Sequence, residues 1–135
     1  MKRFLFAALF AANSLIPAHA GDRAGTVLIH PGETVYAQFE VKGKKIKLTG
    51  FTKDKNEAAQ VLFTLGHDAK KPAVLSLKVE NKFPRDLIYK LEMRNLTLKL
   101  KANVPVSPVV AGKVAFEQFP PQAEELALDD FQLAK

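Results

Sequence analysis

Short runs in which apolar and polar residues alternate strictly are the feature of this chain that most constrains its fold. Val35 to Val41 is one such run, with valine, alanine or phenylalanine at every second position. A period of two sends successive side chains to opposite faces, so the run predicts a β-strand with one buried face. Comparable runs occupy residues 45–49, 75–80, 87–94 and 96–101, and residues 26–29 and 114–116 predict shorter strands.

The links between these runs are short, which favours antiparallel neighbours. Lys42, Gly43 and Lys44 separate two alternating runs and predict a β-hairpin. We expect three leucines to lie in the core, because each stands in the middle of the apolar side of its run. These are Leu77, Leu91 and Leu98.

Residues 54–66 allow two interpretations. Asp54 and Glu57, followed by spaced apolar residues and then Gly66, match a capped helix near 55–65 with a glycine stop. The alternative is a buried strand from Gln60 to Leu65, preceded by a polar turn. Valine, phenylalanine and threonine in this stretch favour the strand, as does a pairing partner that begins at Ala73.

The complete pattern predicts an all-β fold of seven to eight short strands, and we favour an antiparallel, immunoglobulin-like β-sandwich. An α+β fold with one helix near 55–65 is the alternative. Two prolines within Val104 to Pro108 exclude a central strand there and indicate an edge or crossover segment. Residues 126–133 predict a last strand or an irregular tail. Their regular apolar spacing favours docking on the chain's own domain over binding to another chain.

The first twenty residues have the three parts of a secretory signal peptide: Lys2 and Arg3, an apolar run from Phe4 to Ala12, and Ala18-His19-Ala20 as an A-x-A cleavage site. A membrane anchor is the weaker interpretation, because nine apolar residues are too few to cross a bilayer as a helix. We therefore expect residues 1–20 to be removed and residues 21–135 to form a single domain, either periplasmic or secreted. The absence of cysteine fits this, since folding then needs no oxidant.

The residues that carry catalytic chemistry are few, and we predict no enzymatic activity and no cofactor. Ser76 lies in an alternating run and Ser107 precedes a proline, so neither has the local frame of an activated nucleophile. His30 and His67 are the only histidines after residue 20. They are weak candidates for a metal site, which needs three or four converging ligands. Adjacent acidic residues, as at Glu124-Glu125, diverge on a strand and do not form an acid/base pair.

Charge is distributed unevenly along the chain. Residues 21–116 carry 17 basic and 9 acidic residues, whereas residues 117–135 carry one basic and five acidic residues. On the predicted strands, paired lysines point away from the apolar face and form a candidate surface for an anionic partner. An ordinary solvated face with lysines that guard strand edges is the simpler interpretation. The candidate lysines are Lys45, Lys47, Lys99 and Lys101.

The leading functional hypothesis is an exported, non-catalytic binding or accessory module that acts through loops or a strand edge. Its candidate contact loop is 81–86, with Phe83 and Arg85 near the centre. One alternative is a metal carrier or metal-assisted enzyme that uses His30 and His67. The other is a basic protein that associates with the cell-envelope surface. The expected partner is another envelope protein or an anionic envelope surface, and not a nucleic acid, because aromatic residues do not interleave the lysines.

Overall fold

The computed structural model describes residues 25–134, and every regular element in that range is a β-strand. The nine strands are β1 (Val27–Ile29), β2 (Thr34–Lys42), β3 (Lys45–Thr52), β4 (Val61–His67), β5 (Leu75–Asn81), β6 (Leu87–Asn95), β7 (Leu100–Val104), β8 (Val114–Phe119) and β9 (Glu125–Leu133). All strand pairs are antiparallel. The predicted all-β antiparallel class is confirmed, with nine strands rather than seven to eight. The predicted signal peptide lies outside the described residues.

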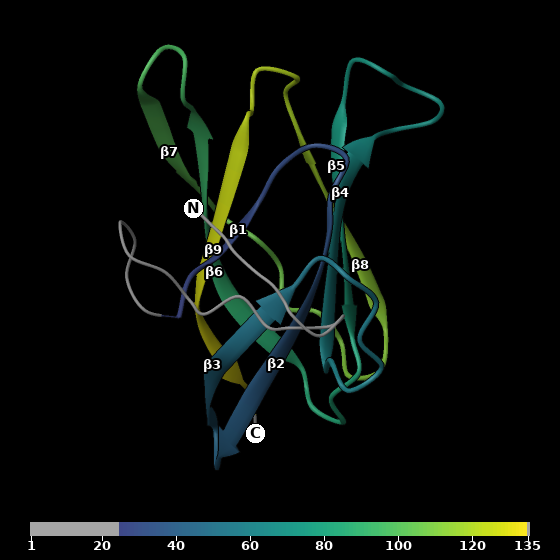
Figure 1. Cartoon of the computed structure of the whole chain (residues 1–135), viewed down its shortest axis with the longest axis vertical. Coiled ribbons are helices and arrows are strands. Elements are labelled where there is room, and N and C mark those ends of the chain that lie inside the picture. Colours follow the sequence, from purple (N-terminus) through teal and green to yellow (C-terminus); the bar gives the residue numbers. More distant parts are fainter. Residues whose placement is uncertain (1–24, 135) are drawn as a thin grey trace.

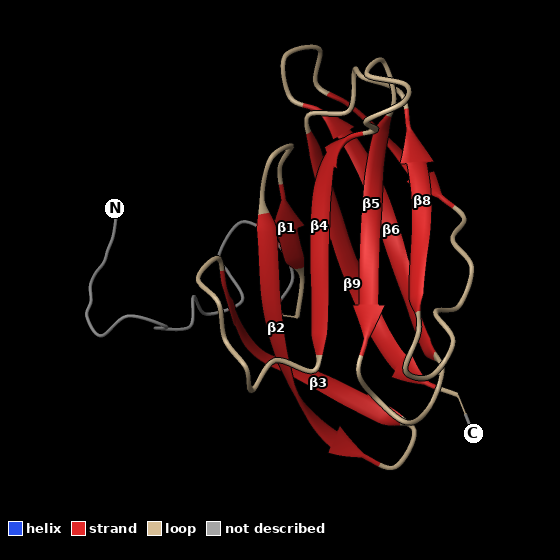
Figure 2. Ribbon diagram, turned by 90° about the vertical axis from the view of Figure 1, so that its right-hand side faces the viewer, coloured by secondary structure: helices blue, strands red, loops and turns tan. Residues whose placement is uncertain are grey.

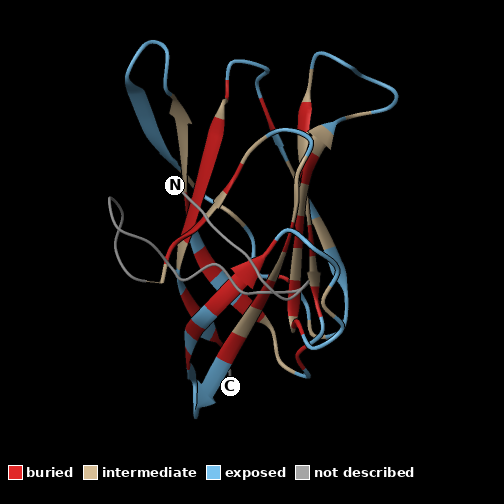
Figure 3. Ribbon diagram, in the orientation of Figure 1, coloured by how far each residue is buried: buried red, intermediate tan, exposed pale blue. Residues whose placement is uncertain are grey.

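The strands form one sheet in the order β7-β6-β9-β3-β2-β4-β5-β8, and β1 pairs with β9 beside this path. The sheet curls, so that β6 and β9 stand opposite β4 and β5, with β2 and β3 joining the two walls (Figures 1 and 2). Residues on the facing surfaces of the two walls are buried (Figure 3). The architecture is therefore a half-barrel with the core between its walls.

Aromatic side chains from both walls meet in this core. The ring of Phe131 on β9 lies 6.1 Å from the ring of Phe63 on β4, 6.2 Å from that of Tyr89 on β6, and 5.0 Å from that of Phe39 on β2. Such offset and edge contacts add to the burial of the rings themselves. Leu77 and Leu91 are 0% and 2% exposed, so both are core residues as predicted.

A β-bulge explains why the alternation in residues 45–49 does not continue into the second half of β3. Gln38 pairs with Gly50 and Phe39 pairs with Leu48, so Thr49 is an extra residue on β3. The extra residue reverses which positions face inward. Phe51 is buried opposite Ala37 as a result, although it breaks the odd-even order set by Ile46 and Leu48.

The ambiguous segment is a strand. β4 covers Val61–His67 and pairs with β5 along its whole length, from Val61 opposite Asn81 to His67 opposite Leu75. The helix near 55–65, and with it the α+β alternative, is wrong. Val61, Phe63 and Leu65 face the core, which matches the β-branched and aromatic composition that favoured a strand.

The strand predicted at 96–101 is wrong for residues 96–99, and the core position predicted for Leu98 is wrong. β6 ends at Asn95 and β7 begins at Leu100, so residues 96–99 form the connecting turn. Leu96, Leu98 and Leu100 are 53%, 65% and 61% exposed. They lie beyond the reach of the opposite wall, and an apolar alternation carries no information on whether anything covers its apolar face. β7 is an edge strand and includes Val104, in agreement with the edge predicted from the prolines.

The acidic C-terminal segment docks on its own domain. β9 lies inside the sheet, with β6 on one side and β1 and then β3 on the other. Two of its acidic residues stand opposite basic residues of β6: Glu125 opposite Arg94 and Asp129 opposite Lys90. Opposite charges at directly paired positions stabilise the pairing of two strands. The alternative of a segment that binds another chain is wrong for residues 125–133.

Candidate functional site

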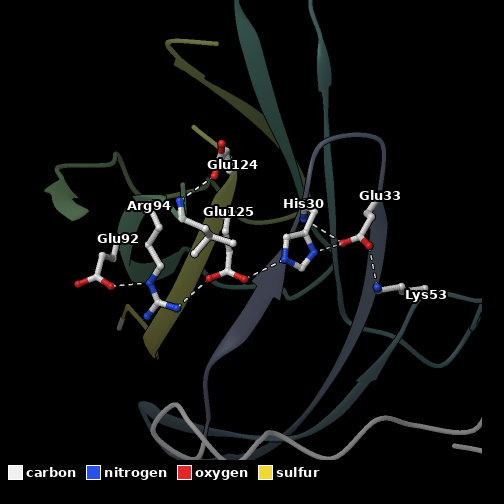
Figure 4. Close-up of polar contacts among 8 residues, drawn as sticks. His30, Glu33, Lys53, Glu92, Arg94, Glu124 and Glu125 are labelled. Carbon is white, nitrogen blue, oxygen red and sulfur yellow. Dashed lines mark hydrogen bonds and ion pairs between the residues drawn. The ribbon is translucent and has the colours of Figure 1, made fainter. Parts of the chain in front are cut away.

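His30 lies at the centre of a chain of alternating charges that crosses from β3 to β6 (Figure 4). Its Nδ1 is 3.0 Å from Glu33 Oε1, and its Nε2 is 2.8 Å from Glu125 Oε2. Glu33 Oε2 in turn accepts a hydrogen bond of 2.6 Å from the amine of Lys53, the residue that follows β3. Both ring nitrogens of His30 therefore face a carboxylate oxygen.

The series of alternating charges continues on the other side of Glu125. Arg94 on β6 donates from Nη1 to Glu125 Oε1 over 2.9 Å and from Nε to Glu92 Oε1 over 2.7 Å. We call these six residues the His30 cluster: His30, Glu33, Lys53, Glu92, Arg94 and Glu125. The Glu125 side chain is only 11% exposed and that of Arg94 21%. An ion pair this sheltered from water has a large effect when one partner is removed.

Local backbone geometry positions His30 and Glu33. His30 and Glu33 are the ends of a tight turn between β1 and β2, in which the Glu33 N–H donates to the His30 carbonyl and the His30 N–H to Glu33 Oε1. Gly32 has a φ of 91°, a conformation that glycine adopts without strain, and its N–H donates to the Leu65 carbonyl on β4. The turn thus holds the imidazole against the start of β9.

The surroundings of His30 favour its protonated form. The hydrogen bond with Glu33 raises the pKa of His30 above its usual 6.5, burial opposes this, and the hydrogen bond with Glu125 adds to the rise. Burial of the Glu33 carboxyl acts to raise its pKa, but hydrogen bonds from His30 and Lys53 outweigh burial and lower the pKa to about 2. A neutral imidazole has one N–H and can donate to only one of its two carboxylates, whereas an imidazolium donates to both.

This arrangement ties the β1–β2 turn to the start of β9, because each ring nitrogen of His30 meets a carboxylate. Within residues 25–134, no three histidine, aspartate or glutamate side chains are grouped so as to hold a metal. His67 lies at the end of β4, where its Nδ1 is 2.9 Å from the Pro72 carbonyl oxygen. The structure therefore gives the two histidines separate partners and does not support the proposed metal role.

Stability should fall with rising pH because of His30. Its folded-state pKa is raised, so its stabilising contribution is complete below the unfolded pKa of about 6.5 and disappears as the pH rises through the folded-state value. Urea unfolding at a series of pH values from about 5 to about 9 should show the difference between wild type and His30→Gln shrinking toward high pH. The matched control is His67→Gln, because that ring contacts a backbone carbonyl. A wild-type advantage over His30→Gln that grows with pH would contradict the assignment.

The contact loop predicted at 81–86 is folded onto the domain. Phe83 is only 6% exposed, and its ring lies 6.0 Å from that of Phe39, so this side chain belongs to the core. Arg85 donates from Nε to the Ala134 carbonyl and from Nη1 to the Gly43 carbonyl, each over 2.7 Å. Both residues tie this loop to neighbouring segments.

The candidate lysines are all exposed, but they are not arranged as predicted. Lys45 and Lys47 share one face of β3, as the alternation indicates. Lys99 lies in the turn after β6 with a φ of 57°, and only Lys101 belongs to β7. The predicted pair on a common strand face is therefore wrong for Lys99 and Lys101. Both still project near the same tip of the molecule.

Sequence reasoning missed the network of charged residues around His30. Glu33, Arg94 and Glu125 come from three segments, and no short motif connects them. One local signal was correct: the adjacent residues Glu124 and Glu125 diverge as predicted. Glu124 accepts hydrogen bonds from the N–H groups of residues 96 and 97, whereas Glu125 bonds His30 and Arg94.

Exposed apolar residues gather in two places among the described residues. One is β8, where Val114 and Phe116 are 45% and 64% exposed on the outer face of the sheet. The other is the turn between β6 and β7 with its three leucines. Single exposed apolar residues are ordinary, whereas a contiguous exposed apolar patch is a candidate interaction surface.

No protein-family model, curated protein or solved structure matches this chain. Within residues 25–134 there is no helix long and apolar enough to cross a membrane.

Proposed function

We propose that this protein is an exported, non-catalytic binding module that holds a partner protein of the cell envelope along the outer edge of β8. The domain would be an immunoglobulin-like sandwich, a proposal supported by the curled sheet that sets β6 and β9 opposite β4 and β5. Such folds bind through their loops and edges, and a partner segment in extended form can add one more strand to an exposed edge.

The observation that carries the proposal is the edge of β8 itself. β8 ends the sheet and pairs on one side only, with β5. Exposed edges are normally guarded by lysine, proline or an inward charge. The sequence of β8, VAFEQF, has no lysine or proline, and its outer face carries Val114 and Phe116. Its one charged residue, Glu117, lies on the inner face and accepts a hydrogen bond from the Ser107 N–H. The opposite edge strand, β7, contains Lys101 and is followed by Pro105.

Contacts on the inner face of β8 keep this strand in place. Phe119 is buried, and Glu117 accepts a hydrogen bond of 3.1 Å from the Ser107 N–H of the segment that follows β7. Lys113, just before β8, donates its N–H to the Val110 carbonyl and accepts one from Asn81. A strand that is fixed on one face and along one edge, with apolar side chains on its free face, is suited to accept a partner strand at little ordering cost.

The double variant Val114→Ser/Phe116→Ser should weaken partner binding at least about tenfold, because apolar anchors of this kind dominate protein interfaces. The measurement is capture from the envelope fraction of the source cells, followed by affinity measurement with the purified partner. A benzophenone photo-crosslinker at position 116 should label the same partner. A crosslinker at the exposed position 55 is the control and should not label it.

The matched control variant is Val41→Ser/Val110→Ser, which removes exposed apolar side chains elsewhere. Equal capture by wild type and by the β8 variant would show that the edge of β8 is not the binding surface. Labelling of only a second copy of this chain from position 116 would replace the partner protein with self-association. Loss of a turnover activity in the His30→Ala/His67→Ala variant, measured well below the melting temperature of the variant so that it stays folded, would overturn the non-catalytic assignment.

A further inference from the structure

The geometry points to a second contact surface: the turn between β6 and β7 docks on an anionic lipid bilayer, with its leucines in the interface and its lysines at the head groups. We call residues 96–101, Leu-Thr-Leu-Lys-Leu-Lys, the leucine tip. This inference stands on observations separate from those at β8, and the two surfaces can serve one protein.

The leucine tip exposes apolar and basic side chains in alternation. Leu96, Leu98 and Leu100 are each more than half exposed, and Lys99 and Lys101 are exposed between and after them. Leucines that enter the boundary of the acyl chains, together with lysines that reach phosphate groups, are the combination that binds anionic membrane surfaces. The alkyl part of a lysine side chain also lies favourably along apolar surroundings while its amine stays in water.

The backbone of the leucine tip is fixed before any contact is made. Glu124 Oε1 accepts hydrogen bonds from the N–H groups of Leu96 and Thr97, over 2.7 Å and 3.0 Å, and Glu124 Oε2 accepts one of 2.9 Å from the Thr97 hydroxyl. Asn95 accepts the Leu98 N–H over 2.8 Å. These bonds hold the leucines outward, although burial would favour their folding back. A surface that is ordered in advance loses little conformational freedom on binding.

Lys99 gives a further indication that this conformation is imposed. Its φ of 57° is in the left-handed region, which a lysine adopts at a cost that neighbouring contacts must offset. Backbone strain of this kind is concentrated at binding and switching sites. In this turn the left-handed residue directs the chain back into β7 and keeps both neighbouring leucines in solvent.

The charge around the leucine tip complements an anionic surface. Figure 1 shows the β4–β5 loop, the β6–β7 turn and the β8–β9 loop at the same end of the molecule, and Figure 2 agrees. This end carries exposed lysines from two of these segments: Lys70, Lys71, Lys99 and Lys101. Its two carboxylates are engaged by backbone N–H groups, Asp68 by those of residues 70 and 71 and Glu124 by those of residues 96 and 97.

The shape of this end favours a bilayer over a protein groove as the occupant. The turn projects past the body of the sheet, and its exposed positions continue into β7 (Figure 3). A projecting tip reaches a planar surface without a matching cavity, and the β4–β5 loop with Lys70 and Lys71 lies at the same end of the molecule.

The chain has no tryptophan, so a single one is an unambiguous reporter. With vesicles of equal parts phosphatidylglycerol and phosphatidylcholine, the fluorescence of a Leu98→Trp variant of the protein should shift to the blue. A Phe116→Trp variant is the matched control and should not shift. Vesicles of phosphatidylcholine alone should give little binding, and added sodium chloride should weaken binding to the mixed vesicles, since salt screens the lysines.

Vesicle co-sedimentation of two variants separates the contribution of the leucines from that of the lysines. Leu96→Ser/Leu98→Ser/Leu100→Ser should bind at least about a hundredfold more weakly, given the apolar area lost from three leucines. Lys99→Gln/Lys101→Gln should lose about fivefold per lysine. The controls are Val114→Ser/Phe116→Ser and Lys45→Gln/Lys47→Gln, which should bind as wild type.

Three outcomes would overturn the inference. The first is no blue shift of Leu98→Trp with the mixed vesicles. The second is equal binding to neutral vesicles, which removes the role of the lysines. The third is that the triple leucine variant and the Val114→Ser/Phe116→Ser control weaken vesicle binding equally. A blue shift produced by a purified envelope protein but not by vesicles would assign the leucine tip to a protein partner instead. Each variant is checked by its melting temperature, which should match wild type because the side chains removed are exposed.

Discussion

Replacing Leu91 with alanine is expected to lower the free energy of unfolding by about 2–5 kcal/mol, whereas Leu98→Ala should change it by less than about 0.5 kcal/mol. The two leucines lie seven positions apart on one hairpin, and both occupy apolar positions of alternating runs. Leu91 is 2% exposed and pairs with Leu128 of β9 and Val104 of β7, so truncation leaves a cavity in the core. Leu98 is 65% exposed and leaves none.

Urea unfolding of both variants, followed by circular dichroism, measures the difference directly. A single pair of substitutions therefore tests where the core ends along β6 and its hairpin. If Leu98→Ala were as destabilising as Leu91→Ala, residues 96–101 would be a covered strand after all. The leucine tip would then have no exposed apolar surface to offer.

Replacing Glu125 with alanine should cost about 3 kcal/mol, at the lower end of the range for breaking a buried ion pair. The substitution takes one carboxylate acceptor from His30 and one from Arg94, at distances of 2.8 Å and 2.9 Å. Both donors would stay beside the core with fewer acceptors than they have now. Glu125→Gln keeps the shape and one acceptor oxygen, so its effect should lie between those of wild type and Glu125→Ala.

The same unfolding experiment on Glu57→Ala is the control. Glu57 is 4.0 Å from Lys55, and both side chains are more than three-quarters exposed, a type of ion pair that contributes little. A similar loss in Glu57→Ala and Glu125→Ala would mean that burial of the His30 cluster adds nothing. A large loss in Glu125→Ala that disappears above the folded-state pKa of His30 would assign most of the effect to the imidazolium.

Sequence alone was enough to identify most strands, because a period of two is a local property. The runs at residues 35–41, 75–80 and 87–94 all lie in strands, and their inward positions follow from the alternation. The strand at 61–67 could also be chosen over a helix, since β-branched and aromatic residues suit a pleated, half-buried surface. Docking of the acidic C-terminal segment was foreseen for a similar reason: its apolar positions are too regular for a solvated tail.

Only the tertiary structure decides whether the apolar side chains of a run are buried and which residues a charged side chain contacts. The leucines at 96–100 alternate as regularly as the apolar residues at 87–93, but they are exposed, and Glu124 from far along the chain closes their turn. His30 meets Glu125 across a separation of 95 residues. Alternation is encoded by neighbours, whereas burial and ion pairing depend on which segments the curled sheet brings together. That is the physical reason why sequence predicted the strands of this protein but not its His30 cluster or its leucine tip.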